Sequence, residues 1–398
     1  MKVMKTGHEI SRCASGLRGL LGGIFMLLVA LVLVGCPLAA RADSLDTYIR
    51  AKMAVAKVPG IAACIVKDGQ VVWSSGYGWA NLETQTAVTP DTVFMIASIS
   101  KVVTGTSLMQ LFEQGVFTLD GPVTDHLPFS VSNPNYPDEP ITFRQILSHA
   151  SSIQDNPVLL SAFYSEGDSP IPLGLYLENY LSPGGVLYGP NRNFYDYAPG
   201  TAVNYSNIGF ALCGYLVEAI TGVSFADYCT QHLFVPLQMN ETSWFLRDLD
   251  ETQLAMPYQY DFKTRKYVAY GQYGYPDYPD GQLRTSARQL ANFLIASINY
   301  GEFGSARILE QATAEEMRRV QYPELSSTTG LAWEYEEHNG ETRLGHYGGD
   351  KGVTTAMWFR PSDGVGVIAL ANGDFSFPWQ QKALLDILDR LFNEADQF

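Results

Sequence analysis

A serine and a lysine stand three positions apart in the apolar stretch FMIASISKVVTG, residues 94–105. At that spacing Ser98 and Lys101 face the same side of a helix. Apolar surroundings disfavour an ammonium group and lower the pKa of a lysine, so a neutral Lys101 could take the proton of the Ser98 hydroxyl. The pattern predicts a serine nucleophile beside its base. A lysine that reaches the surface near a chance serine gives the same short pattern, so further parts of a site are needed.

Two further motifs supply such parts. The stretch GTAVNYSNIGF places Tyr205 and Asn207 at a predicted junction of a loop and a helix, and LGHYGGDKG places His346 and Gly348 on a predicted strand. A phenol can relay a proton between a nucleophile and a leaving group. In this order, the three motifs resemble those of the serine hydrolases of the class C β-lactamase and D-alanyl-D-alanine carboxypeptidase family. The marks of that family are Ser-x-x-Lys, Tyr-x-Asn and Lys/His-x-Gly.

The resemblance covers roughly residues 45–395 and includes the flanking stretches QILSHASSI, PGTAVNYSN and GQLRTSARQLANFL. It implies that Ser98 accepts the acyl group and that Lys101 shares the role of base with Tyr205. Asn207 is then expected to hydrogen-bond Lys101 and the acyl amide of the substrate.

The third motif is expected to line the substrate. The resemblance implies that His346 replaces the more common lysine at the head of this motif, and that Gly348 and Gly349 let the strand lie close to the substrate. By analogy, the backbone N–H groups of Ser98 and Gly349 form the oxyanion hole, in which each donor typically accelerates such a reaction by roughly 10²–10³-fold.

The motif His-Tyr-Gly departs from the Lys-Thr-Gly of most β-lactamases. A lysine there serves a substrate carboxylate, whereas a histidine is cationic only part of the time near neutral pH. Tyr347 is bulkier than threonine, which suggests a narrower cleft, and Lys351 could supply a cation or be an exposed loop residue. The sequence therefore predicts an acyl-enzyme hydrolase of ester, amide or lactam bonds, closer to an esterase or D-peptidase than to a true β-lactamase. The alternative is a non-catalytic ligand-binding or sensor protein on the same fold.

Composition limits the partners. The formal net charge is −15 over 398 residues, and such an acidic chain repels phosphate backbones, so we expect no nucleic-acid partner. No His-Glu-x-x-His, Gly-x-Ser-x-Gly or phosphate-binding glycine-rich motif occurs, and no cysteine or histidine pair has metal spacing. We expect no metal and no cofactor, and a small acyl compound (ester, peptide or lactam) as the partner.

The N-terminus resembles an export signal. A basic segment precedes the apolar run of residues 20–34, and the small-residue site Ala40-Arg41-Ala42 follows. We expect a signal peptide over residues 1–42, cleavage after Ala42, and a periplasmic or secreted protein. The sequence around Cys36 resembles a lipoprotein box, so a lipid anchor at Cys36 is the alternative, and an uncleaved membrane tether is the third.

Residues 43–398 are expected to form one hydrolase domain of two lobes with the active site between them. The fold class is α/β (α+β), with the DD-peptidase/β-lactamase fold. Strand patterns lie at both ends of the chain and helical patterns lie between them, which predicts one antiparallel sheet flanked by helices and a central, mostly helical lobe. Helices are expected after the caps Ser44, Thr142 and Ser286.

Some residues outside the motifs invite a second interpretation. We expect His149 to pack or to hydrogen-bond within its helix. Residues 154–200 are expected to form a long loop-rich insertion. The tyrosine-rich stretches 188–197 and 258–278 could line an aromatic subsite or pack ordinarily. Cys213 and Cys229 could form a disulfide or remain as small buried apolar groups.

Overall fold

The computed structural model describes the backbone of residues 37–398 and the side chains of residues 44–398. The chain divides into two compact units, 1–49 and 50–398, and helix α2 (Pro37–Ala56) crosses from the first to the second. The predicted cap Ser44 is wrong, because Ser44 lies inside α2; the preceding residues 38–42, LAARA, are mostly strong helix formers. The expected cleavage site after Ala42 falls inside α2, whereas Cys36 and most of the predicted signal peptide lie outside the described residues.

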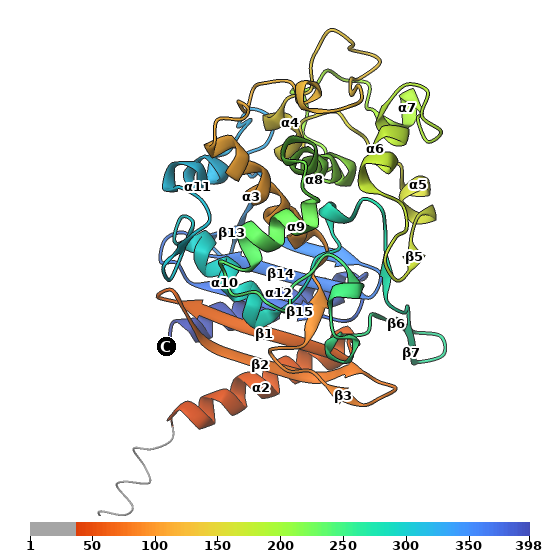
Figure 1. Cartoon of the computed structure of the whole chain (residues 1–398). Helices are drawn as coiled ribbons and strands as arrows, with labels where there is room; N and C mark the ends of the chain where they lie inside the picture. The colour runs from red at the N-terminus through yellow and green to blue at the C-terminus, as the bar shows by residue number, and fades with distance from the viewer. Residues whose placement is uncertain (1–36) are drawn as a thin grey trace, which may run out of the picture. The chain divides into compact units, whose positions relative to one another are not determined.

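A seven-stranded antiparallel sheet organises the second unit (Figure 1). Its spatial order begins with the last strands of the chain, and strand β15 pairs with β1 so that Ile61 lies opposite Ala371. The predicted sheet from both ends of the chain is therefore confirmed. The order is β12 (Glu334–His338), β13 (Glu341–Asp350), β14 (Val353–Phe359), β15 (Gly366–Ala371), β1 (Gly60–Lys67), β2 (Gln70–Asn81) and β3 (Thr86–Ala87).

Two tight hairpins fix the register of this sheet. Asp68 and Gly69 join β1 to β2 with φ values of 51° and 70°, and Asn339 and Gly340 join β12 to β13 with 52° and 81°. Two positive φ values in succession define the turn whose twist matches antiparallel strands, and Asp-Gly and Asn-Gly are its preferred pairs.

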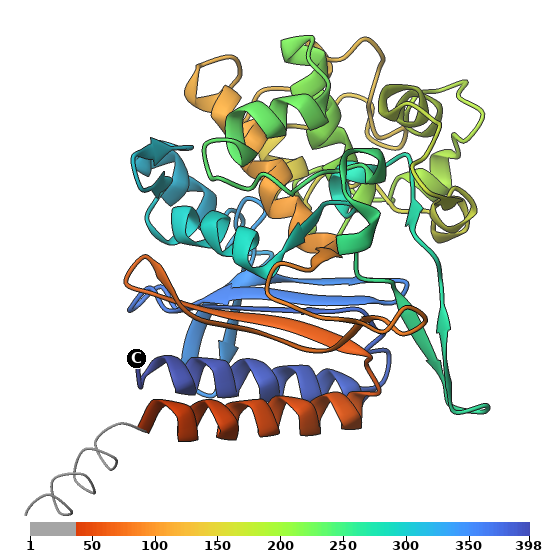
Figure 2. The same cartoon turned by 60° about the horizontal axis from the view of Figure 1, so that its bottom comes forward.

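Helices cover both faces of the central strands. Helix α12 (Pro378–Ala395) packs on β1 and β15 from one side and α10 (Ala287–Ile298) from the other (Figure 2). A strand covered on both faces must be apolar throughout, as GIAACIVK and GVIALA are. The side chain of Ser286 accepts a hydrogen bond from Gln289 N and caps α10 as predicted.

The central part of the chain forms the predicted helical block around two long helices, α3 (Ser100–Glu113) and α8 (Asn207–Thr221), which pack on each other. Thr142 caps the next helix through a capping box, as predicted. The other helices of this block are α4 (Phe143–Leu147), α5 (Pro157–Ala162), α6 (Leu173–Leu181), α7 (Pro190–Asn193), α9 (Phe225–Cys229) with the π-helical segment η3 (Thr230–Phe234), and α11 (Gln311–Arg318).

The loop-rich insertion expected over residues 154–200 is only partly correct. This segment contains α5, α6 and α7, and α6 contributes Tyr176, Leu177 and Tyr180 to the buried core. The frequent Pro and Gly residues hid the helical spacing of these apolar side chains.

Short elements connect the sheet to the helical block. Strand β4 (Val93–Met95) pairs with β9 (Arg284–Ser286), and each leads directly into or out of a segment of the site. The remaining elements are β5 (Ser165–Glu166), β6 (Tyr258–Asp261), β7 (Lys266–Ala269), β8 (Tyr273–Gly274), β10 (Glu302–Phe303), β11 (Ala306–Arg307), η1 (Ala97–Ile99), η2 (Val123–His126), η4 (Leu246–Asp248), η5 (Glu251–Gln253) and η6 (Tyr278–Asp280).

The cysteines of the described part of the chain, Cys64, Cys213 and Cys229, are free and buried, so the disulfide considered for Cys213 and Cys229 does not form. Burial raises the pKa of Cys229 to about 12, which keeps its thiol protonated and unreactive. Within residues 37–398 no single helix is both long and apolar enough to cross a membrane. Only α8 with residues 225–234, bent by 85°, reaches that length and composition together.

Candidate active site

Lys101 lies at the centre of a small hydrogen-bond network. Its Nζ donates to Ser98 Oγ at 3.2 Å, to Asn207 Oδ1 at 2.7 Å and to the backbone oxygen of Asp280 at 2.7 Å. Ser98 sits in the short turn η1, directly before α3, and Lys101 lies in the first turn of α3 with 0% of its surface exposed. An ammonium has three donors, and three acceptors surround this one.

Charged neighbours oppose the neutral form expected for Lys101. Burial, the largest influence, lowers the pKa of Lys101, but the negative charges of Tyr205, Asp280 and Asp155 outweigh it, and the pKa is raised. The sequence argument considered burial alone, because the acidic partners come from distant parts of the chain. The raised pKa favours the ammonium form of Lys101, whose hydrogen bond holds Ser98 in place.

The backbone before the nucleophile is strained. Ala97 has φ of 47°, a left-handed conformation that costs a residue with a Cβ about 1–2 kcal/mol. Strand β14 fixes this turn, since Thr355 Oγ1 donates to Ile96 O at 2.7 Å. Strain of this kind gathers at functional sites, where the surrounding structure holds the backbone in place.

Tyr205 stands next to this network, in the loop that leads into α8. Its ring stacks on His149 with 4.4 Å between the ring centroids, and Ser206 N donates to His149 Nδ1 at 3.1 Å. Burial raises the pKa of Tyr205, whereas Lys101 and the hydrogen bond with Ser98 lower it, and the net direction is upward. With 41% of its surface exposed, Tyr205 keeps contact with solvent, which limits that rise. His149 has the packing and hydrogen-bonding role that we expected, but it lies beyond the end of α4, with φ of 59°, and not within a helix.

Asp155 positions the second motif, and sequence reasoning missed it. Its carboxylate accepts from Ser206 Oγ at 3.1 Å, from Asn207 N at 2.8 Å and from Ile208 N at 3.1 Å. A carboxylate at the first N–H groups of α8 also interacts favourably with the helix dipole. The only signal in the sequence was an acidic residue shortly after LSHASS, and acidic residues are common in turns of this kind.

The third motif lies on strand β13. His346 is buried, and its Nε2 lies 3.9 Å from Glu334 Oε1. Burial and the charge of Lys101 lower its pKa, with Glu334 opposing them, so the imidazole is neutral at neutral pH. The lowered pKa makes His346 cationic for a smaller part of the time than an exposed histidine, which the sequence could not show because it did not reveal how deeply the ring is buried.

The end of β13 offers a free strand edge. Its pairing with β12 ends at Gly345, opposite Glu334, so residues 346–350 continue alone on that side. A Cβ on Gly348 would overlap Thr355 Oγ1 and Ile96 O, whereas a Cβ on Gly349 meets nothing within 4 Å. Gly348 thus lets β13 approach the nucleophile turn, and Gly349 leaves open space before it.

Two cavities meet at the nucleophile. A cavity of about 200 Å³ and another of about 680 Å³ share Ser98, Tyr205 and Gly349 in their walls. The smaller cavity is also lined by Asn207 and a set of acidic and aromatic side chains: Tyr164, Tyr275, Asp277, Asp280 and Asp350. The larger lies beside β13 and α12, and its lining includes Glu334, Glu336, His346, Tyr347, Phe375 and Leu384. A substrate cleaved at Ser98 could place its acyl part in one cavity and its leaving group in the other.

The tyrosine-rich stretches differ in their relation to the site. Tyr275 lines the smaller cavity, but no residue of 188–197 lines either cavity. Tyr347 lines the larger cavity and donates to Glu336 at 2.8 Å. Lys351, the possible cation, instead places its Nζ 3.7 Å from the centroid of the Tyr164 ring.

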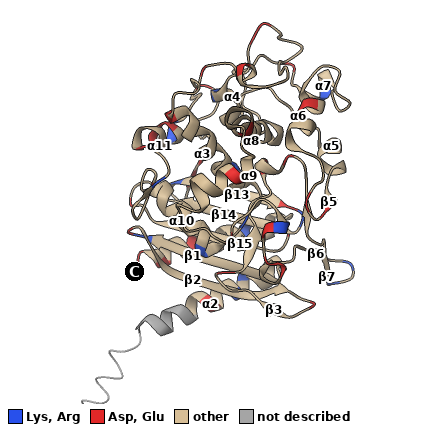
Figure 3. Ribbon diagram, viewed as in Figure 1, with Lys and Arg blue, Asp and Glu red and all other residues tan. Residues whose placement is uncertain are grey.

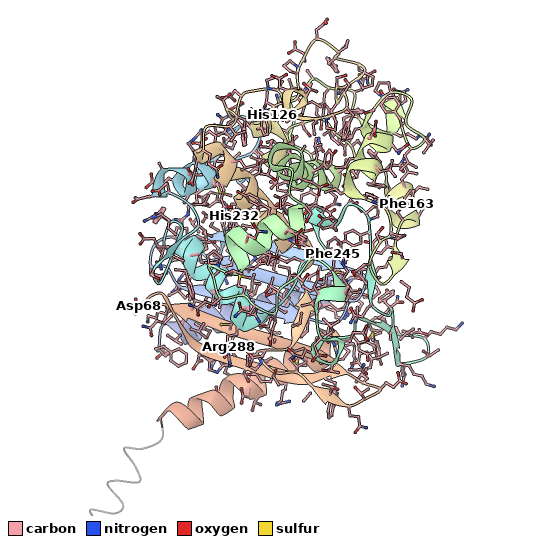
Figure 4. All side chains as sticks on the ribbon, viewed as in Figure 1. Asp68, His126, Phe163, His232, Phe245 and Arg288 are labelled. Carbon is pink, nitrogen blue, oxygen red and sulfur yellow. The ribbon has the colours of Figure 1, made fainter. Side chains whose placement is uncertain are left out.

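The described residues show no arrangement for a metal ion. Within residues 44–398, no group of three or more His, Cys, Asp or Glu side chains is placed to hold one. His126 and His232 come from separate elements of the fold (Figure 4). Acidic and basic positions are interspersed along the ribbon in the view of Figure 3.

Comparison with known proteins agrees with this geometry. The family model described as Beta-lactamase matches residues 45–390. Protein flp of Staphylococcus aureus (strain MW2) is 25% identical over 336 residues, which are 83% of this chain and 63% of flp. The chain thus spans less than two thirds of the length of that relative.

Solved structures share the fold. The octameric penicillin-binding protein homologue of Pyrococcus abyssi has 28% identity and a TM-score of 0.66, with 86% of this chain and 77% of that chain covered. The D-amino acid amidase of Ochrobactrum anthropi SV3 in complex with L-phenylalanine has 21% identity and a TM-score of 0.69, with 89% and 98% covered. The chain belongs to the beta-lactamase family, and it shares the fold of the penicillin-binding protein homologue.

Proposed function

We propose that this protein hydrolyses ester or amide bonds through an acyl-enzyme on Ser98. The observation that carries the proposal is the contact of Lys101 Nζ with both Ser98 Oγ and Asn207 Oδ1, at the junction of two cavities. A nucleophile held by a positioned partner and open to substrate from two sides fits acyl transfer.

Acylation begins with a proton transfer from Ser98 to Tyr205. The reactive form of the Lys101–Tyr205 pair has lost one proton and carries a phenolate beside the ammonium. Ser98 Oγ forms a bond to the carbonyl carbon as its proton moves to Tyr205 Oη. The tetrahedral intermediate then breaks its bond to the leaving group, which takes the proton from Tyr205.

Deacylation reverses these transfers with water. A water molecule attacks the ester carbon while Tyr205 Oη accepts its proton. The bond to Ser98 Oγ breaks, the serine takes the proton back, and the carboxylic acid leaves. In both steps the backbone N–H groups of Ser98 and Gly349 are proposed to stabilise the oxyanion.

The third motif argues against substrates with a carboxylate in the leaving group. His346 is neutral at neutral pH, and Glu334 and Glu336 line the same larger cavity. A β-lactam or a peptide terminus would bring an anion to acidic side chains without a cation to receive it. We therefore propose an esterase or amidase rather than a true β-lactamase.

Hydrolysis of p-nitrophenyl acetate by residues 43–398, with Ser98→Ala alongside, tests the proposal. Turnover by the wild-type protein and loss of turnover in the variant support it. If both proteins turn over at the same rate, Ser98 is not the nucleophile. If no acyl compound labels the wild-type protein, a non-catalytic binding protein on this fold is the better account.

We also propose export of the protein, on the strength of the N-terminal sequence alone. Mass spectrometry of the mature protein tests this proposal, because an N-terminus at Asp43, a lipidated Cys36 and an uncleaved chain differ in mass.

A further inference from the structure

The smaller cavity beside Ser98 is rich in carboxyl groups. Three carboxylates, those of Asp277, Asp280 and Asp350, line its wall together with the rings of Tyr164 and Tyr275. Asp350 has partners within the fold, since Tyr164 Oη donates to its Oδ1 at 2.7 Å and Lys351 N donates at 2.7 Å. The burial of the carboxyl groups of Asp277 and Asp280 needs a separate explanation.

The carboxyl groups of Asp277 and Asp280 belong to buried residues and have no side-chain hydrogen-bond partner among the described residues. Only 4% of Asp277 and 6% of Asp280 is exposed, and no side chain of the described residues donates a hydrogen bond to either carboxylate. Lys101 contacts the backbone oxygen of Asp280, and its other two hydrogen bonds go to Ser98 and Asn207. Buried carboxylates without a side-chain partner are costly, even with the charge of Lys101 nearby.

The surrounding charges increase this cost. Burial raises the pKa of Asp277 to about 7, and repulsion from Asp155 and Asp350 adds to the rise, while Lys101 opposes it. Burial also raises the pKa of Asp280 well above its ordinary value, against the pull of Lys101. A cation entering the cavity would lower both pKa values and recover part of this cost.

We propose that the smaller cavity binds the ammonium group of the substrate's acyl part, so that the enzyme cleaves esters or amides of small amino acids with a free amino group. This inference rests on the proposed acyl transfer at Ser98 and names its substrate class. The α-amino group of such a substrate lies close to the carbonyl carbon that Ser98 attacks, which matches a cavity that shares Ser98 and Asn207 in its wall.

The shape and lining of the cavity favour a small organic cation. Its volume of about 200 Å³ lies below the roughly 300 Å³ at which drug-sized pockets begin. The ring of Tyr275 can contact an ammonium through its face, whereas the ring of Tyr164, with its centroid 5.1 Å away, already has Lys351 Nζ 3.7 Å from its centroid. The described side chains hold no group arranged for a metal ion, so the carboxylates are not explained as metal ligands.

A pair of matched substrates tests the inference. We would compare alanine p-nitroanilide with N-acetylalanine p-nitroanilide in both the D and the L form, because the leaving group is the same and only the positive charge differs. We expect kcat/KM to favour the free amine by about 10- to 100-fold, the range of a hydrogen bond to a charged group. In Asp277→Asn this preference should fall by about tenfold or more.

A control variant removes the same charge elsewhere. Asp138 is exposed and lies outside both cavities, so Asp138→Asn should keep the wild-type preference. If Asp138→Asn loses the preference as Asp277→Asn does, net charge rather than the cavity selects the amine, and the inference is wrong.

Failure of this inference can be told apart from failure of the proposed function. Equal kcat/KM for both members of the pair, with Ser98-dependent turnover of p-nitrophenyl acetate, overturns the amine site and leaves acyl transfer intact. Binding of alaninamide to Ser98→Ala, measured by calorimetry, needs no catalysis. Binding that Asp277→Asn weakens supports the amine site even if no ester is cleaved, and no binding to Ser98→Ala overturns it.

Discussion

Lys101 Nζ lies 2.7 Å from Asn207 Oδ1, although 106 positions separate the two residues in the chain. This contact joins the start of α3 to the start of α8, so the first two motifs form one hydrogen-bonded unit. Because the ammonium of Lys101 also donates to Ser98 Oγ, the nucleophile is held by the same contact. The consequences of this arrangement can be tested one residue at a time.

Tyr205→Phe separates ring packing from proton transfer. The ring still stacks on His149, so the melting temperature should stay close to that of the wild-type protein, while kcat falls by about 10²- to 10⁴-fold, the usual contribution of a general acid–base group. Wild-type kcat in this variant would rule out the proposed relay.

The pH profile reports the same pair. The pKa values of Lys101 and Tyr205 are both raised, and the reactive form has lost one of their two protons. We therefore expect kcat/KM to rise with pH through neutrality into the alkaline range, with an apparent pKa that belongs to the pair. Tyr205→Phe should lose this rise. A wild-type rate that falls as the pH rises from 6 to 9 would contradict the assignment.

Asp155→Ala tests the positioning of the second motif. The change leaves Ser206 Oγ, Asn207 N and Ile208 N without their acceptor, and we expect a loss of about 1–3 kcal/mol in the free energy of unfolding. Misplacement of Asn207 should also lower kcat more than it raises KM. Asp155→Asn keeps one acceptor oxygen and should recover part of both losses. If both variants lower kcat equally, Asp155 does not act by positioning Asn207 at the start of α8.

Gly348 and Gly349 form a matched pair. A Cβ at Gly348 overlaps Thr355 and Ile96, so Gly348→Ala should lower the melting temperature and the activity together. A Cβ at Gly349 meets no protein atom within 4 Å but enters the space shared by both cavities. Gly349→Ala should therefore keep its melting temperature and raise KM. Reversed effects would mean that the strand edge does not face the substrate.

His346→Lys asks whether the missing cation limits substrate choice. Lysine at this position supplies a positive charge that the neutral imidazole does not, beside the larger cavity. We expect hydrolysis of a substrate with a carboxylate in its leaving group to gain relative to p-nitrophenyl acetate. Melting temperature serves as the control for folding, since His346 is buried. An unchanged ratio of the two activities would show that Glu334 and Glu336, rather than His346, exclude carboxylates.

The sequence predicted the fold better than it predicted the electrostatics of the site. Two-residue turns such as Asp68-Gly69 and helix caps such as Ser286 depend on neighbouring residues, and they were predictable. The upward pKa shift of Lys101 was not, because Tyr205 and Asp280, whose charges raise it, are more than a hundred positions away in the chain. The roles of Asp155 and Asp277 were not predicted for the same reason. The local sequence around a loop aspartate does not show which helix end or cavity it will face in the fold.

The most direct test of the account is a search for the covalent intermediate. We would quench the protein with acid during turnover of p-nitrophenyl acetate, measure its intact mass, and map the modified peptide. The account predicts the added mass of one acetyl group on Ser98 in the wild-type protein and none in Ser98→Ala. An acetyl group on a residue other than Ser98 would contradict the central role of Ser98. So would turnover that leaves no adduct and proceeds at the same rate in Ser98→Ala.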